Sequence, residues 1–144
     1  MNGTTGNSRA RSILIVVLLC ILVVPIGAFS LFVGWNKAFA PLEILAEHSA
    51  WTIHLPVIVG RAIGILELIA ATALFAALAV PRLARIGMYA AIWITLNNVV
   101  AAIVHIIFAE WHTLPQSAVV ITLCVIMVLL FASRARGLKQ KGDI

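Results

Sequence analysis

The chain has 144 residues, of which 63% are hydrophobic and 10% are charged, and its formal net charge is +5 at neutral pH. A soluble domain carries about 25% charged residues, and a globule of this size could not bury so much apolar surface, so the composition excludes a water-soluble domain. The basic residues lie in short clusters between apolar runs, which argues against nucleic-acid binding and indicates a protein of the lipid bilayer.

The cysteines carry no redox or metal motif. Cys20 and Cys124 lie deep inside apolar runs and form no CxxC pair. We therefore expect no metal site and no thiol redox chemistry. A disulfide between these two residues is disfavoured, because nothing exposes them to an oxidant.

The N-terminal residues 1–11 are polar and predict a disordered cytoplasmic tail. The apolar run 13–33 that follows is long enough to span a bilayer of about 30 Å, with Pro25 expected to kink the helix. A cleaved signal peptide is the alternative for this run, because residues 28–30 resemble a cleavage context. Apolar residues continue past that point, which favours the transmembrane helix.

Residues 34–54 are predicted to connect the first span to the second. Pro41 suits the start of a short amphipathic helix on the membrane surface, with Trp35 and Trp51 as interfacial anchors. Three further spans are predicted over residues 55–80, 86–109 and 114–133. Short connections between the spans favour an all-α, antiparallel four-helix bundle over residues 12–133, followed by a basic cytoplasmic tail over 134–144.

The distribution of lysine and arginine predicts the orientation. The two tails and the turn after the second span contain Arg9, Arg11, Arg82, Arg85, Arg134, Arg136, Lys139 and Lys141. Outside the spans, the other side has only Lys37. Because cytoplasmic loops of membrane proteins are enriched in basic residues, both termini are predicted to be cytoplasmic.

The second span carries an ionisable residue on a face of small residues. Gly60, Gly64, Glu67 and Ala71 recur at helical spacing and share this face. The Gly-x-x-x-Gly pattern lets a neighbouring helix approach closely, so the carboxyl group should point toward protein. A charged group at the bilayer centre costs about 2.5–3.5 kcal/mol, and Glu67 therefore needs a partner or a function.

Helix rise places the polar residues of the second and third spans at matching depths. The candidate ligand-binding residues are Lys37, Arg61, Glu67, Asn97, Asn98 and His105, with Glu67 the candidate proton-active group. Near the midplane we expect a protonated Glu67 that donates a hydrogen bond to Asn97 or Asn98. Nearer the outer surface, Arg61 and His105 form a second layer. Glu43, Glu47, Glu110 and His112 are expected to surround the mouth of the cluster.

Each of these residues also has a purely structural interpretation. Glu67 and the two asparagines could serve only as interhelical hydrogen bonders, Arg61 could extend to the interface, and His105 could be a hydrogen-bonded core histidine.

Four short motifs follow one another along the chain, namely Gly34-x-x-Lys37, the run 64–67, Pro81-Arg82 and His105. Their order and spacing resemble those of the DoxX-like membrane proteins, and the resemblance covers residues 13–133. It implies a four-helix protein of the bacterial cytoplasmic membrane, with Lys37, Glu67 and His105 as the polar core. Better-described relatives are subunits of thiosulfate:quinone oxidoreductases or partners in membrane-associated oxidoreductase and oxidative-stress complexes, whereas most members have no assigned activity.

Together these observations favour a quinone- or small-ligand-binding subunit that supports a membrane-associated oxidoreductase. The sequence has no cysteine pair or haem-ligand pair to carry electrons, so enzymatic activity of the chain alone is left open. A small proton-coupled transporter with Glu67 as its proton-binding site is one alternative, and a structural or assembly partner without a ligand is another. A homo-oligomer is compatible with each.

Overall fold

The computed structural model describes residues 3–142, and side chains over residues 9–138. The elements are α1 (Gly3–Phe39), α2 (Leu42–Glu47), η1 (Trp51–His54), α3 (Val57–Ala79), η2 (Pro81–Leu83), α4 (Ala84–Ile107), η3 (Trp111–Thr113) and α5 (Leu114–Gly142). Within the described part of the chain, four helices are long and apolar enough to cross a membrane, namely α1, α3, α4 and α5. The predicted all-α fold with four membrane-spanning helices is therefore confirmed.

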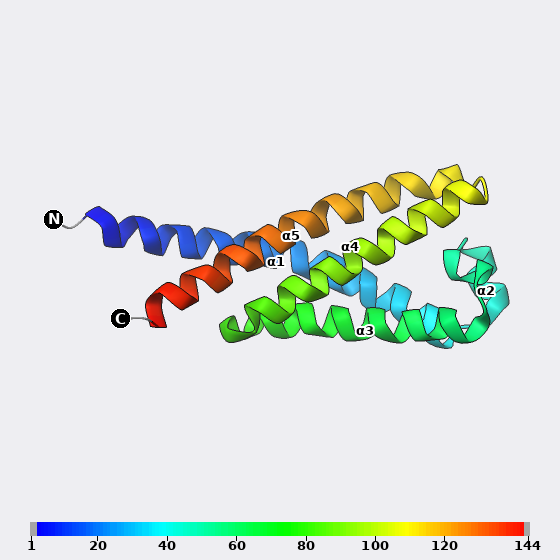
Figure 1. The fold of residues 1–144 in the computed structure, drawn as a ribbon, viewed down its shortest axis with the longest axis horizontal. Coiled ribbons are helices and arrows are strands. Elements are labelled where there is room, and N and C mark those ends of the chain that lie inside the picture. Colours follow the sequence, from blue (N-terminus) through cyan, green and yellow to red (C-terminus); the bar gives the residue numbers. More distant parts are fainter. Residues whose placement is uncertain (1–2, 143–144) are drawn as a thin grey trace.

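The four long helices form an antiparallel bundle. α1 packs along α3, α4 packs along α5, and the bundle closes through contacts of α3 with α4 and of α1 with α5. Both termini and η2 lie at one end, whereas α2, η1 and η3 lie at the other (Figure 1). The short helix α2 corresponds to the predicted amphipathic helix of the first connection.

The first helix is longer than the apolar run that predicted it. The stretch 3–11, expected to be a disordered tail, is helical, and so are residues 34–39, which were assigned to the connection. Residues 134–142 likewise continue α5 beyond the predicted span. Extending an existing helix adds one hydrogen bond for each residue fixed, so polar residues can prolong a helix that apolar residues have established. Lys37 is therefore a helical residue.

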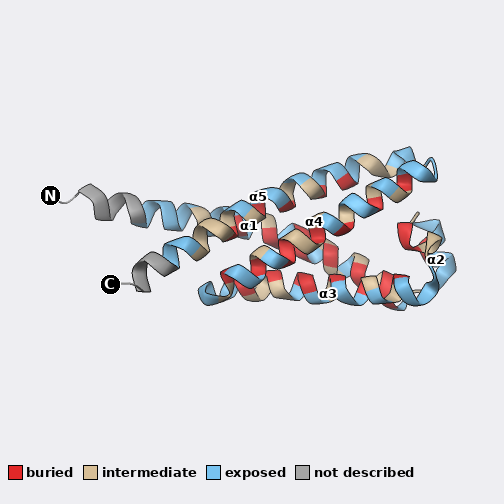
Figure 2. Cartoon of the chain, viewed as in Figure 1, coloured by how far each residue is buried: buried red, intermediate tan, exposed pale blue. Residues whose placement is uncertain are grey.

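The core consists of the inward faces of the four helices. Buried residues, shown red in Figure 2, alternate along each helix with exposed ones. Small residues such as Ala71, Ala77 and Ala91 are fully buried between helices, whereas Ile58 is 81% exposed and Ile107 is 70% exposed. Large apolar side chains on the outer surface are expected where the surrounding solvent is lipid. Both Cys20 and Cys124 are free thiols.

Candidate functional site

Two glycines bring α1 and α3 together near the end opposite the termini. A Cβ atom on Gly64 would lie 2.5 Å from the backbone nitrogen of Ala38 and 2.9 Å from the carbonyl oxygen of Gly34. A Cβ atom on Gly34 would lie 3.0 Å from the carbonyl oxygen of Gly64. Side chains are excluded from this contact, as the glycine pattern of the second span predicted. The contact places Lys37, on α1, directly against α3.

Lys37 and Glu67 form a buried ion pair across this contact. The Nζ atom of Lys37 donates to Oε2 of Glu67 at 2.7 Å, and the two side chains are only 5% and 2% exposed. The predicted hydrogen bond from Glu67 to Asn97 or Asn98 is therefore wrong. Because α1 remains helical through residue 37, the lysine side chain lies at the level of Glu67 and provides a charged partner.

Arg61 was predicted to form a layer with His105, but in the structure it contacts the end of α1 instead. Its Nη1 atom donates to the backbone carbonyl of Lys37 at 3.0 Å. This carbonyl belongs to the last turn of α1, where unpaired carbonyls favour a cation. Arg61 thus holds the end of the helix that carries Lys37.

His105 is instead part of a cluster formed around Glu110. The Oε2 atom of Glu110 lies 2.6 Å from Nδ1 of His105, and Oε1 lies 3.4 Å from Nε2 of His54. His54 also stacks on Phe108, with ring centroids 3.6 Å apart and planes 5° apart. The hydrogen bond from His105 is the main cause of a lowered pKa for Glu110, opposed by partial burial and assisted by His54. This cluster ties η1 to the turn between α4 and α5.

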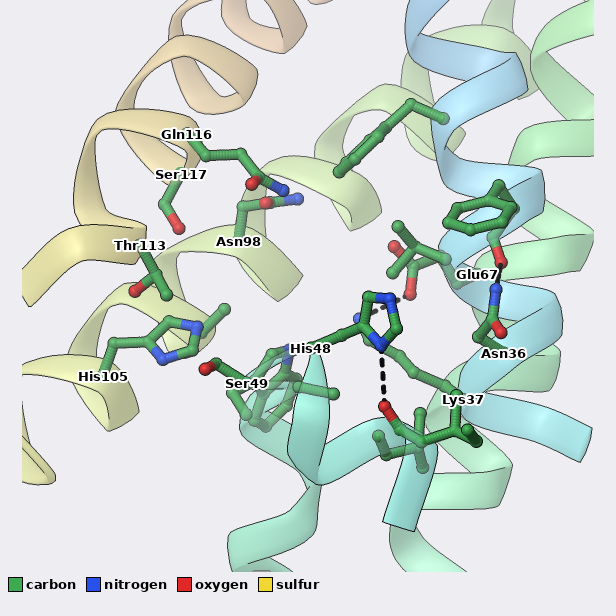
Figure 3. A pocket seen from close by; sticks show the side chains of 18 residues that line it. Asn36, Lys37, His48, Ser49, Glu67, Asn98, His105, Thr113, Gln116 and Ser117 are labelled. Atoms are coloured by element: carbon green, nitrogen blue, oxygen red, sulfur yellow. Dashed lines mark hydrogen bonds and ion pairs between the residues drawn. The ribbon is translucent and has the colours of Figure 1, made fainter. Parts of the chain in front are cut away.

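A pocket of about 150 Å³ lies between these two clusters, and residues of α2 and η1 contribute to its lining (Figure 3). Lys37, Glu67, Asn98 and His105 all line it, so the structure brings together four of the six predicted site residues. Its other polar lining residues are Asn36, His48, Ser49, Thr113, Gln116 and Ser117, and its apolar walls are Phe29, Phe32, Val33, Ile44, Leu45, Ala50, Trp51 and Ala101.

The remaining predicted residues lie outside this pocket lining. Asn97 is buried on α4 and Arg61 is bonded to the backbone of α1. Glu43 and Glu47 are exposed on α2. His112 lies 3.5 Å from the hydroxyl of Ser49 and thus contacts the connection between α2 and η1.

Sequence reasoning missed the contributions of α2 and α5 to the pocket. His48 follows α2, and Gln116 and Ser117 lie in the first turn of α5. Ser117 is 5% exposed, and a serine among the apolar residues of a span was the one signal that could have identified it. For His48, nothing in the sequence indicates proximity to Lys37.

The comparison with known families agrees with this architecture. A family model for the DoxX-like family matches residues 15–129. The chain belongs to the DoxX-like family. The match includes every residue that lines the pocket of this DoxX-like protein. No curated protein and no solved structure matched the chain.

Proposed function

We propose that this DoxX-like protein binds a quinone head group in the Lys37–Glu67 pocket, as a membrane subunit that supports an oxidoreductase. The observation that carries the proposal is a buried, charged hydrogen-bond donor in the wall of a ring-sized, largely apolar pocket. Such a combination of apolar walls and a few polar groups is typical of small-molecule sites.

The size of the pocket favours a single ring. A cavity of about 150 Å³ holds benzene in an engineered protein, and drug-sized ligands need about 300 Å³ or more. Phe29, Phe32 and Trp51 contribute aromatic rings to the wall, and aromatic rings stack favourably on a planar ligand.

The polar groups favour a ligand with oxygen acceptors. The ammonium group of Lys37 has three N–H donors, and only Glu67 accepts from it among the described side chains. Ser117 adds a buried hydroxyl, and the Nδ2 atom of Asn98 already donates to the carbonyl of Ile94. Lys37 and Ser117 can therefore orient a carbonyl-bearing ring. A bound quinone would supply a carrier of electrons and protons.

The position of the pocket favours a ligand that arrives from the bilayer. Phe32 on α1 and Gln116 on the neighbouring α5 both line the pocket and are exposed on the bundle surface. An isoprenoid tail could therefore extend into lipid between these helices. Because better-described DoxX-like proteins are oxidoreductase subunits, membership of this family supports a partner that exchanges electrons with the bound ring, in the bacterial cytoplasmic membrane.

The test is retention of quinone by the full chain purified in discs of native lipid, followed by extraction and chromatographic quantification. We expect the parent to retain quinone at a stoichiometric level. The variant Ser117→Leu should lose it, because the larger side chain fills the pocket. Thr122→Leu, on the exposed face of the same helix, should retain it.

Thermal unfolding of both variants, followed by tryptophan fluorescence, shows whether each is folded. Absence of quinone from the parent, or equal retention in the two folded variants, would contradict the proposal.

A further inference from the structure

The end of the bundle that contains both termini and η2, away from the Lys37–Glu67 pocket, is strongly basic. Arg11 on α1 and Arg134 and Arg136 on α5 line a second pocket of about 690 Å³, to which Pro81 of η2 also contributes. All the carboxylates among the described side chains belong to the other half of the molecule, namely Glu43, Glu47, Glu67 and Glu110. The three arginines therefore face no carboxylate within residues 9–138.

Arg134 is held in place by the end of α3. Its Nη1 atom donates to the carbonyls of Ala77 and Leu78, at 2.9 Å and 3.2 Å. A cation is favoured at the C-terminal carbonyls of a helix. A guanidinium group carries five N–H donors in one plane, and in residues 9–138 the protein provides acceptors only for Nη1 of Arg134. Its remaining donors have no acceptor within residues 9–138 and can bind an external anion.

The rest of the lining combines hydroxyl groups with apolar residues, among them Leu138 near the arginines. The hydroxyls of Ser12 and Ser133 lie beside the arginines in sequence, and Ile15 and Val16 continue the wall toward the middle of α1. Pro81, which lines the pocket, lies where the candidate span of α3 ends and that of α4 begins, and Arg134 bonds to the last turn of α3. The charged part of the pocket is therefore level with the ends of these spans, where lipid head groups are expected, and Ile15 and Val16 lie farther toward the acyl region.

We propose that this pocket binds the phosphate group of an anionic phospholipid, with an acyl chain lying along Ile15 and Val16. Arginine matches phosphate through paired hydrogen bonds, and basic pockets between transmembrane helices bind lipid head groups. A zwitterionic head group would bring an ammonium ion next to three arginines, so phosphatidylglycerol is favoured over phosphatidylcholine. This site is independent of the Lys37–Glu67 pocket and of its ligand.

The test compares two double variants of equal charge in the full-length protein. Arg11→Gln/Arg136→Gln removes two exposed arginines of the pocket, and Arg134 is kept because it also supports α3. Arg82→Gln/Arg85→Gln removes two exposed arginines at the same end that do not line the pocket. Binding is followed in mixed micelles by the rise in melting temperature as dioleoyl phosphatidylglycerol, dioleoyl phosphatidylcholine or inorganic phosphate is added.

We expect phosphatidylglycerol to stabilise the parent, and phosphatidylcholine and inorganic phosphate to have little effect at the same concentration. Loss of the two pocket arginines should weaken the apparent affinity for phosphatidylglycerol about 10- to 30-fold, whereas the control pair should change it about twofold at most. An equal loss in both double variants would indicate only a general surface attraction and would overturn the site. Equal stabilisation by inorganic phosphate would overturn the assignment to a lipid.

Discussion

One ion pair, between Lys37 and Glu67, connects the first and second membrane-spanning helices. Both side chains are almost fully buried, and Nζ lies 2.7 Å from Oε2. A lone charge in the membrane interior costs about 2.5–3.5 kcal/mol on insertion scales, and the pairing offsets part of this cost for each residue. Removing one partner of a buried pair leaves an uncompensated charge. The stability of the bundle should therefore depend on the two residues together.

Because each substitution leaves the other residue of the ion pair unpaired, we expect Lys37→Met and Glu67→Gln each to destabilise the protein by about 3 kcal/mol or more. The double variant should lose less than the sum of the two single losses, because neither residue is then left unpaired. Denaturant unfolding in detergent gives the free energy of unfolding of the two single variants and of the double variant. Glu47→Gln, an exposed substitution on α2, is the control, and additive losses in the double variant would contradict the coupling.

Between elements, glycine determines how closely α1 can approach α3. The space beside Gly64 is occupied by the backbone of Ala38, Lys37 and Gly34, which cannot move without displacing the whole helix. Lys37 is part of that backbone segment, so the close contact and the ion pair depend on each other. By contrast, a Cβ atom on Gly137 of α5 would meet nothing within 4 Å.

These two glycines provide a matched test. Alanine has a better helix propensity than glycine by about 1 kcal/mol, so Gly137→Ala should leave stability unchanged or raise it slightly. Gly64→Ala should lower stability by about 1–3 kcal/mol, because overpacking outweighs the propensity gain. Thermal unfolding in detergent compares the two. If Gly64→Ala were as stable as the parent or more stable, the close contact between α1 and α3 would not contribute to the stability of the bundle.

At the scale of the whole molecule, the two ends differ in charge and chemistry. The end with both termini and η2 carries arginines that lack carboxylate partners within residues 9–138, whereas the other end carries the glutamates and the ring-sized pocket. The positive-inside rule predicts that the arginine-rich end is cytoplasmic. A ligand in the Lys37 pocket would then lie toward the outer leaflet.

Reporter fusions test this orientation. Fusions placed after Arg85 and after Lys141 should both report the cytoplasm, because an even number of spans separates them. A fusion after Glu47, within the first connection, should report the outer side. An outer-side signal at Lys141 would contradict the four-span topology, because two spans separate Arg85 from Lys141.

The sequence by itself determined the helices and the face of α3 that packs against its neighbours. Apolar runs predict spans because backbone groups in lipid must be hydrogen-bonded within the helix. The spacing of Gly60, Gly64 and Glu67 predicted a close, protein-facing contact because helical periodicity puts these residues on one side. The structure finds all three buried on that side.

The tertiary structure alone decided which polar groups meet. Helix rise gives the depth of Glu67, but it does not give the rotation of the neighbouring helices or the reach of a lysine side chain. Hydropathy also did not mark the end of α1, because polar residues can extend an established helix. For this reason Lys37, and not Asn97 or Asn98, is the partner of Glu67. His48 and Ser117 reach the same pocket from distant parts of the chain, through the packing of α2 and α5.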